Sequence, residues 1–190
     1  MLIEASHFID PETCSQLRSA YDASSPEDRQ KSCDAPIYPE RLGSQARALI
    51  RREINRMRRF FEISLKQNLY VETVVLACIR DGYEMPAHAD NCRRLGHAWV
   101  PNHTPDRAFS AIVYLNGEGI RGGEIHFPDR GIKVKPETGK IVAFTSNQDY
   151  VHEVLRVEGG HRYSMPVWYT LKADRALVDF HEAEVNYAVS

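Results

Sequence analysis

The spacing of hydrophobic residues divides the chain into two regions. Between Ser44 and about Leu65, apolar side chains recur at steps of three and four residues, the period of one face of a long amphipathic helix. These side chains are Ile50, Ile54, Met57, Phe61 and Leu65. After residue 70 the chain changes to short segments rich in β-branched and aromatic residues, which are typical of strands. We therefore expect the long helix to pack against a sheet formed by the later region.

A shorter helix is predicted near the start of the chain. Asp10 followed by Pro11 is typical of a helix N-cap with proline in the first turn, and Leu17 and Tyr21 continue at helical spacing. Residues 22–43 are rich in proline, serine and charged side chains. This composition predicts a mobile connector between the two helices.

Strand-like segments are separated by Gly, Pro, Asn and Asp turns throughout the second region. They cover residues 71–79, 108–116, 123–128, 131–135, 140–144, 151–157 and 162–171. Parallel strands need intervening helices, and no helical pattern fits between them, so the strands should be antiparallel. We predict an α+β protein whose core is a helix-backed barrel or a double-sheet jelly roll.

The length of 190 residues, 43% of them hydrophobic, suits one domain. Its helical support would cover about residues 10–66 and its β core about residues 70–171. The tail, residues 172–190, is expected to form a terminal helix or an arm.

Composition and charge narrow the function classes. With 24 Lys and Arg against 26 Asp and Glu, the net charge is −2, so we expect no nucleic-acid partner. The start of the chain does not resemble a secretion signal, and no apolar run could span a bilayer, so we expect no membrane partner. Four cysteines without a CxxC motif indicate reduced thiols and a cytoplasmic location. The arginines of helix 44–65 are interpreted as a solvated face.

A candidate metal site begins at His88-Ala89-Asp90. Side chains two positions apart in an extended strand point the same way, so His88 and Asp90 would present an imidazole and a carboxylate together. His152, at the start of another predicted strand, is the candidate third ligand. Two histidines and one carboxylate suit ferrous iron and leave coordination positions open. Taken alone, the HxD motif also fits a polar strand end.

Arg162 adds a candidate anion site. It opens the last predicted strand, ten positions after His152, and Ser164 lies on the same face. A guanidinium can bind a carboxylate through two parallel hydrogen bonds. The alternative interpretation of Arg162 is a surface ion pair.

The order of these motifs resembles the iron(II)- and 2-oxoglutarate-dependent dioxygenases, most closely their prolyl 4-hydroxylase-like branch. The matching segments are EASHFIDPETCSQL at the start, HAD at 88–90, YLN at 114–116, GGEIHFP at 122–128, HEV at 152–154 and RYS at 162–164. The resemblance covers residues 1 to about 171. It implies a double-stranded β-helix, or jelly-roll, core of antiparallel strands backed by N-terminal helices.

The resemblance also implies roles for individual residues. The implied iron(II) ligands, which are also the catalytic residues, are His88, Asp90 and His152. The implied 2-oxoglutarate residues are Arg162, Tyr114 and Ser164. O2 would be the second cosubstrate and ascorbate an optional reductant, and 2-oxoglutarate would be converted to succinate and carbon dioxide. Because Asp90 keeps the carboxylate that related halogenases replace by a small residue, hydroxylation of an unactivated C–H bond is favoured.

The polar segment 91–107 follows the first two metal ligands directly and resembles the substrate-covering loop of prolyl hydroxylases. Its candidate substrate residues are Arg93, Arg94, Trp99 and Arg107, which could hold an acidic or peptide substrate. Alternatively, Trp99 packs the loop down and the arginines are solvated. The substrate would be a prolyl residue in a peptide or protein, or a free amino acid or related small molecule.

Two other function classes stay open from the sequence. One is a non-catalytic, metal-dependent sensor or binding module on the same fold. The other is a zinc hydrolase, which would leave Arg162 without a purpose. His97 and His103 are interpreted as surface histidines, and Cys92 as a quiet buried thiol. Met85 stands where some relatives carry a tyrosine.

Overall fold

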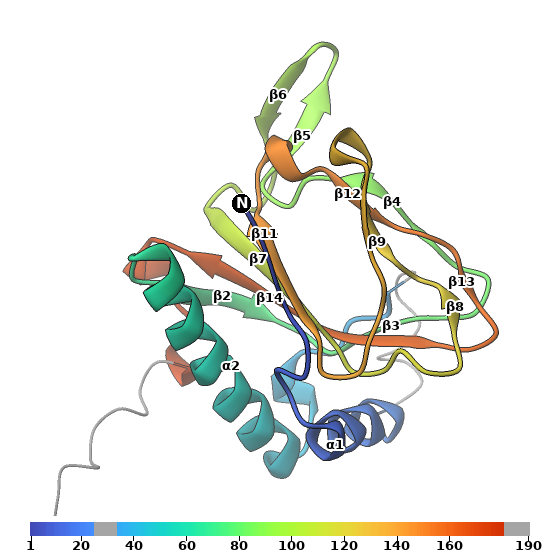
Figure 1. Ribbon diagram of the computed structural model, residues 1–190. Helices are drawn as coiled ribbons and strands as arrows, with labels where there is room; N and C mark the ends of the chain where they lie inside the picture. The colour runs from blue at the N-terminus through green and yellow to red at the C-terminus, as the bar shows by residue number, and fades with distance from the viewer. Residues whose placement is uncertain (25–33, 181–190) are drawn as a thin grey trace, which may run out of the picture.

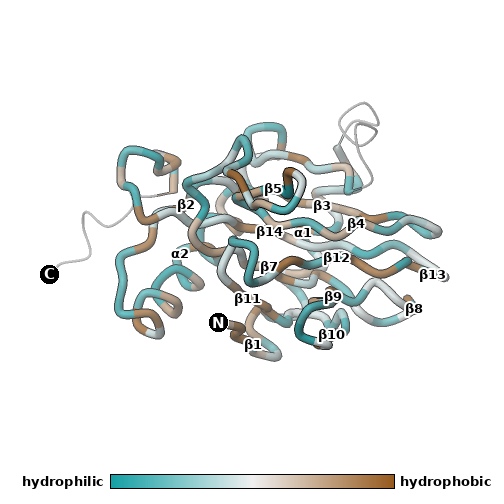
Figure 2. The backbone as a smooth tube through the Cα atoms, turned by 90° about the horizontal axis from the view of Figure 1, so that it is seen from above, coloured by the Kyte–Doolittle hydropathy of each residue, from teal (hydrophilic) through white to brown (hydrophobic). Residues whose placement is uncertain are grey.

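Two antiparallel sheets face each other in the computed structural model, which describes residues 1–24 and 34–180 (Figure 1). The helices α1 (Pro11–Asp22) and α2 (Ser44–Leu65) lie outside the larger sheet. Viewed from above, α2 lies towards one end of the sheets, and the short pair β8 (Arg121–Gly122) and β13 (Val157–Glu158) lies at the other (Figure 2). This architecture confirms the predicted helix-backed jelly roll.

The larger sheet has the strand order β1-β11-β7-β14-β2, and β3 also pairs with β14. Its strands are β1 (Leu2–Ala5), β2 (Tyr70–Val74), β3 (Ala77–Ile79), β7 (Arg107–Tyr114), β11 (Ile141–Thr145) and β14 (Arg162–Thr170). The sequence patterns did not predict β1. They also predicted residues 71–79 as one strand, whereas the structure divides this segment into β2 and β3.

Pro166 lies in the middle of β14, although proline within a sheet is usually confined to edge strands and bulges. β14 is not an edge strand, because it pairs with β7 on one side and with β2 and β3 on the other. Val75, between β2 and β3, donates its N–H to the Pro166 carbonyl at 3.1 Å. In a strand, the N–H and the carbonyl of one residue point to the same side. The missing N–H of Pro166 therefore falls beside the interruption between β2 and β3, and not within a continuous ladder.

The smaller sheet has the order β10-β9-β12-β4. Its strands are β4 (Met85–His88), β9 (Ile125–Phe127), β10 (Ile132–Val134) and β12 (His152–Val154). Between the two sheets, an apolar cluster that includes Tyr114, Phe127 and Phe144 fills part of the barrel. The rest of the interior is available for a site.

Both helices begin as their sequences predict. The Asp10 side chain caps α1 by accepting a hydrogen bond from the Thr13 N–H at 2.8 Å, with Pro11 in the first turn. The bounds of α2 match the predicted helix. Its buried side chains, including Ile50, Ile54, Met57 and Phe61, join one core cluster with residues of the larger sheet.

Several arginines of α2 take part in the fold. Arg52 and Arg56 both pair with Glu53, which is only 3% exposed, at 2.7 and 2.8 Å. Arg58 pairs with Glu62 one turn further on, at 3.3 Å. Most arginines of α2 are nevertheless exposed, as expected of a solvated face, whereas Arg58 is half-buried.

The predicted connector at residues 22–43 is partly ordered. Ile37 and Leu42 are buried in the core, and Ile37 forms a β-bridge with Leu76. The prediction of a mobile connector is therefore wrong for this later part of the segment, because apolar side chains anchor it. Residues 25–33 lie outside the described residues.

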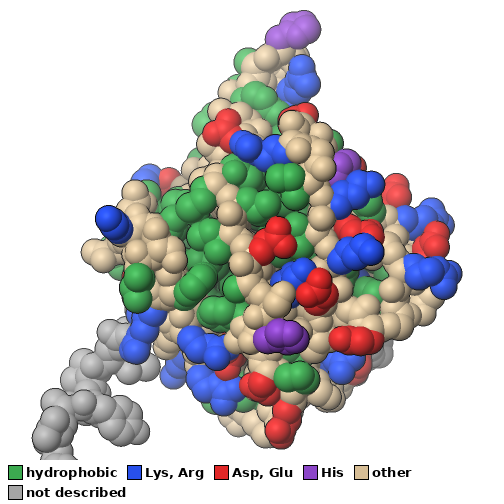
Figure 3. All heavy atoms as spheres, in the orientation of Figure 1, with side chains coloured by type: hydrophobic (Ala, Val, Ile, Leu, Met, Phe, Trp, Pro, Cys, Tyr) green, Lys and Arg blue, Asp and Glu red, His purple; other side chains and the backbone are tan. Residues whose placement is uncertain are grey.

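The predicted loop at residues 91–107 is largely a hairpin of β5 (Cys92–Leu95) and β6 (Ala98–Pro101). It projects from the body of the protein and carries positively charged and histidine side chains (Figure 3). The predicted tail starts with short 3-10 turns at residues 173–175 and 178–180, and residues 181–190 lie outside the described part.

Two further predictions concern thiols and membranes. Cys14, Cys78 and Cys92 are buried free thiols, whereas Cys33 lies outside the described residues. Across the part of the chain that the structure describes, no helix is long and apolar enough to cross a membrane.

Candidate functional site

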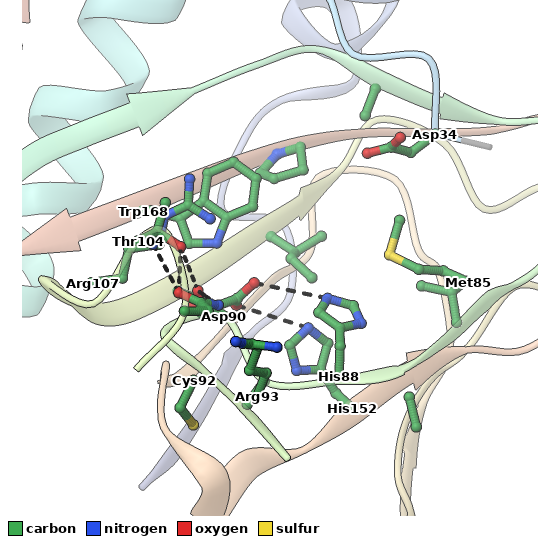
Figure 4. Close-up of a pocket in the computed structure, with 18 of the residues that line it drawn as sticks. Asp34, Met85, His88, Asp90, Cys92, Arg93, Thr104, Arg107, His152 and Trp168 are labelled. Carbon is green, nitrogen blue, oxygen red and sulfur yellow. Dashed lines mark hydrogen bonds and ion pairs between the residues drawn. The ribbon is translucent and has the colours of Figure 1, made fainter. Parts of the chain in front are cut away.

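A cavity of about 590 Å³ lies between the two sheets and below the β5–β6 hairpin. Its lining includes the three predicted metal ligands and a wall formed by an arginine and a tryptophan (Figure 4). The predicted anion-binding arginine, Arg162, also lines it. Volumes of this size are typical of small-molecule sites.

The predicted metal ligands come together at this cavity. The register of β12 on β4 sets His152 opposite His88, and Asp90 follows two residues after His88. Nε2 of His88 lies 3.8 Å from Asp90 Oδ1, and Nε2 of His152 lies 3.8 Å from Asp90 Oδ2. One ligand atom from each residue lies within 4.8 Å of the others, and the described residues contain no second such cluster.

Backbone carbonyls orient both imidazoles. Nδ1 of His88 lies 2.9 Å from the Pro86 oxygen, and Nδ1 of His152 lies 3.0 Å from the Tyr150 oxygen. Because a carbonyl only accepts, each Nδ1 must carry a proton, so Nε2 is the ring atom of each histidine that can offer a lone pair to a metal beside Asp90. Burial lowers the pKa of His152, which favours its neutral, metal-binding form. Two neutral imidazoles and a carboxylate fit a ferrous ion.

Arg162 is almost completely buried, with 3% of its surface exposed, at the start of β14. Its Nε donates to the Gly123 carbonyl at 2.9 Å, and Nη1 donates to Ser164 Oγ at 3.2 Å. Its Nη2 is buried without a hydrogen-bond partner, and no acidic side chain of the described residues pairs with the guanidinium. A buried cation without a counter-ion costs several kcal/mol. The arrangement therefore fits a carboxylate ligand such as 2-oxoglutarate.

The two glycines of GGEIHFP explain how the acceptor reaches Arg162. Gly122 has a φ of +68°, and a Cβ at this position would lie only 1.9 Å from the Arg156 carbonyl oxygen. Any larger residue would push the segment away from residue 156. The tight backbone carries Gly123 past the arginine, where its carbonyl oxygen accepts the Nε hydrogen bond.

Tyr114 lies beneath the same arginine. The Arg162 guanidinium carbon is 4.8 Å from the centre of the Tyr114 ring, which favours a cation–π contact. The tyrosine is fully buried, and burial raises its pKa, so the hydroxyl keeps its proton. The hydroxyl lies 3.4 Å from the Val134 carbonyl. Its role as a donor to 2-oxoglutarate stays a prediction.

Another cavity wall is formed by Arg107 and Trp168 (Figure 4). The Arg107 guanidinium carbon lies 4.1 Å from the Trp168 ring centre, and its Nε lies 3.4 Å from Glu72. The sequence patterns had identified Arg107 but not Trp168. A signal was present, because alternation along β14 puts residues 162, 164, 166 and 168 on one face, and all four line the cavity.

The other predicted substrate residues lie on the hairpin. Arg93, Arg94 and Trp99 line the mouth of the cavity. Trp99 is 38% exposed. Arg93 and Arg94 are exposed, as the alternative interpretation expected, and neither forms an ion pair with a described residue.

The remaining candidate residues lie outside the predicted metal cluster. His97 and His103 are exposed, as expected of surface histidines, and Cys92 is buried with its Sγ 3.7 Å from Gln148 Oε1. Met85 lines the cavity and gives this wall an apolar side chain. Tyr83 is 47% exposed.

Comparisons with known proteins agree with this geometry. The family model described as "2OG-Fe(II) oxygenase superfamily" matches residues 74–170. Prolyl 3-hydroxylase 2 from Gallus gallus is 33% identical over 101 residues, which cover 48% of this chain but only 14% of that protein. The chain thus corresponds to a small part of this curated relative.

Two solved structures share the fold over most of the chain. The viral collagen prolyl hydroxylase of Paramecium Bursaria Chlorella virus-1, solved with 2OG, has a TM-score of 0.70 and 21% identity, covering 90% of this chain and 96% of the viral one. A prolyl-4-hydroxylase from Pseudomonas putida has a TM-score of 0.61 and 20% identity, covering 90% of this chain and 92% of its own.

Removing His152 should abolish tight metal binding. His152→Ala leaves His88 and Asp90 as the only ligands of the cluster, so we expect Mn(II) affinity to fall by roughly 100-fold or more. Calorimetric titration of the metal-free protein measures this affinity. His126→Ala, on the neighbouring strand β9, is the matched control and should bind Mn(II) as the parent does. Unchanged binding by His152→Ala would remove this residue from the site.

Removing Arg162 should weaken the cosubstrate and spare the metal. Losing a buried charge-assisted contact costs about 2–4 kcal/mol, so 2-oxoglutarate affinity in the presence of Mn(II) should fall roughly 30- to 700-fold in Arg162→Ala. Mn(II) affinity alone should stay within about threefold of the parent. Arg121→Ala, which removes a largely exposed arginine, is the control. Equal 2-oxoglutarate affinity in Arg162→Ala and the parent would contradict the assignment.

Proposed function

Because the chain belongs to the 2OG-Fe(II) oxygenase superfamily, we propose that it is an iron(II)- and 2-oxoglutarate-dependent hydroxylase of unactivated C–H bonds. One observation carries the proposal: the His88-Asp90-His152 cluster lines the same cavity as Arg162, whose guanidinium has no acidic partner among the described residues. A metal site alone would not need a buried cation beside it. Iron(II), when bound, supplies the oxidising chemistry, in which O2 and 2-oxoglutarate are consumed and succinate and carbon dioxide are formed.

The protein side chains have separate tasks in this proposal. The three ligands hold the metal at one wall of the cavity through two neutral Nε2 atoms and a carboxylate. Arg162 orients 2-oxoglutarate by its distal carboxylate, with Ser164 and Tyr114 beside it. Arg162 has a free donor at Nη2, so an arriving carboxylate gains a hydrogen bond without breaking one. Ascorbate would serve only to keep the iron reduced.

A prolyl residue within a peptide is the substrate that the surroundings support best. Similar proteins carry the name prolyl hydroxylase, and residues of the projecting β5–β6 hairpin line the cavity, so a peptide could bind along the hairpin. Arg93 and Arg94 on this hairpin have no acidic partner among the described residues, which favours a peptide with acidic side chains near the target. Arg107, stacked on Trp168, offers a guanidinium to the backbone or to an acidic group of the substrate.

A free amino acid or related small molecule is the competing substrate class. Relatives are named both prolyl 3-hydroxylase and prolyl-4-hydroxylase, so either ring carbon is a candidate for oxidation.

We place the chain in the cytoplasm as a single catalytic domain without nucleic-acid or membrane partners. Buried free thiols and the near-neutral charge support this placement.

The activity itself is tested by product formation. Purified protein with iron(II), ascorbate, O2 and 2-oxoglutarate should release succinate, and proline-containing peptides should gain one oxygen atom in mass spectrometry. The His88→Ala variant is the control for free iron. A protein that binds metal and 2-oxoglutarate yet releases no succinate, with or without substrate pools, would instead be the non-catalytic sensor or binding module.

Charge reversal tests the hairpin as the substrate site. Two synthetic peptides with a central proline flanked by glutamates or by lysines should differ in hydroxylation rate, the acidic peptide reacting faster. Arg93→Glu/Arg94→Glu should lower the preference for the acidic peptide by roughly 2- to 30-fold at low salt, since each of the two surface pairs contributes about 0.2–1 kcal/mol. Arg47→Glu on α2 is the matched control. The same preference in parent and hairpin variant would exclude these arginines, whereas uncoupled succinate release would still report the activity.

A further inference from the structure

The backbone of Asp90 is held on both sides. Its N–H donates to the Ser146 carbonyl at 3.0 Å. Its carbonyl accepts from Thr104 Oγ1 at 2.8 Å and from Asn102 Nδ2 at 3.1 Å. With the main chain held in this way, rotation of the side chain is the remaining freedom of this ligand.

Ser110 restrains that rotation. It lies on β7 in the opposite sheet, is 2% exposed, and places its Oγ 2.5 Å from Asp90 Oδ2. The Oγ of Ser146, on the segment following β11, lies 2.8 Å from Ser110 Oγ. A carboxylate accepts only, and a hydroxyl has a single proton, so Ser110 must donate to Asp90 and Ser146 must donate to Ser110. The two hydroxyls form a directed chain that ends on one carboxylate oxygen, and each bond strengthens the next.

The histidines alone do not distinguish the two oxygens of Asp90. Oδ1 lies 3.8 Å from His88 Nε2, and Oδ2 lies 3.8 Å from His152 Nε2. In the described part of the chain, no lysine or arginine pairs with this carboxylate, and Ser110 is the one side chain that donates a hydrogen bond to it. The asymmetry of the ligand therefore comes from Ser110.

We propose that Ser110 is a positioning residue that engages Asp90 Oδ2 so that the carboxylate binds iron through Oδ1 alone. The inference rests on the proposed function, because it concerns the same metal centre. If two imidazoles and one carboxylate oxygen held the iron, coordination positions would be left for a keto acid and O2. A carboxylate bound through both oxygens would occupy one of them. Ser110 thus keeps a coordination position available.

Cobalt(II) is the probe for the test, because its visible absorption depends on the number of ligands and its affinity can be measured without turnover. Ser110→Ala should bind Co(II) roughly 10- to 100-fold more weakly than the parent, the range typical when a partner of a metal ligand is removed. Its visible spectrum should change as the carboxylate becomes free to bind through both oxygens. Ser110→Thr retains a hydroxyl and should restore the affinity and spectrum of the parent.

Two further variants make the measurement specific. Ser146→Ala removes the donor behind Ser110 and should weaken Co(II) by a smaller factor. Thr145→Ala removes a neighbouring hydroxyl that bonds Asn147 instead, and it should leave affinity and spectrum unchanged. Thermal unfolding shows whether each variant is folded. If Ser110→Ala does not fold, Ser146→Ala decides, and parental affinity and spectrum in that variant would overturn the proposal.

The possible results distinguish a failure of this inference from a failure of the proposed function. Parental Co(II) affinity and spectrum in a folded Ser110→Ala overturn the positioning role while the metal centre stands. Absence of Co(II) binding by the parent protein overturns both, since Ser110 would then have no bound metal to serve.

Discussion

The antiparallel pairing of β12 with β4 is the constraint on which the site depends, because it brings two ligands together from distant parts of the chain. It sets His152 opposite His88 and leaves the ring centroids 4.4 Å apart. A shift by one residue would turn His152 to the other side of its sheet. The ring of Phe144 packs 4.6 Å from that of His152, so the same aromatic cluster that fills the barrel also holds the imidazole.

A second constraint is the unbalanced charge of Arg162. The Gly123 carbonyl, the Ser164 hydroxyl and the Tyr114 ring compensate part of the cost of burying the guanidinium. None of them carries a negative charge, and Nη2 keeps its donor capacity. The cavity therefore contains a buried cation beside the predicted metal ligands, which is the arrangement that the proposed dianionic cosubstrate requires.

Two neighbouring strands of the larger sheet combine stability and chemistry. The inner faces of β7 and β14 carry Ser110, Arg162 and Trp168 at the cavity. Their outer faces carry Val113 and Val167, which join the core beneath the helices. Because strand side chains alternate, packing α1 and α2 on one face fixes which residues the other face presents to the site. The helices thus act on the chemistry indirectly, through the register of the sheet.

The spacing of residues close together in the sequence was enough to predict a large part of the fold and of the candidate site. The bounds of α2, the cap at Asp10, and the shared face of Arg162 and Ser164 follow from contacts between residues a few positions apart, which a sequence displays directly. The order of motifs was sufficient to indicate the family. The apolar residues of the connector, however, were hidden in a segment dominated by proline, serine and charge.

Features that depend on residues far apart in the sequence were determined only by the tertiary structure. Residues 92–101 form a hairpin through cross-strand pairing, and Pro166 is tolerated inside the sheet because the ladder beside it is interrupted at Val75. Ser110 acquires its role only where β7 crosses Asp90, twenty residues earlier in the chain. A lone serine in a strand carries no signal of such a contact, since a hydrogen bond between two sheets depends on how they pack and not on local spacing.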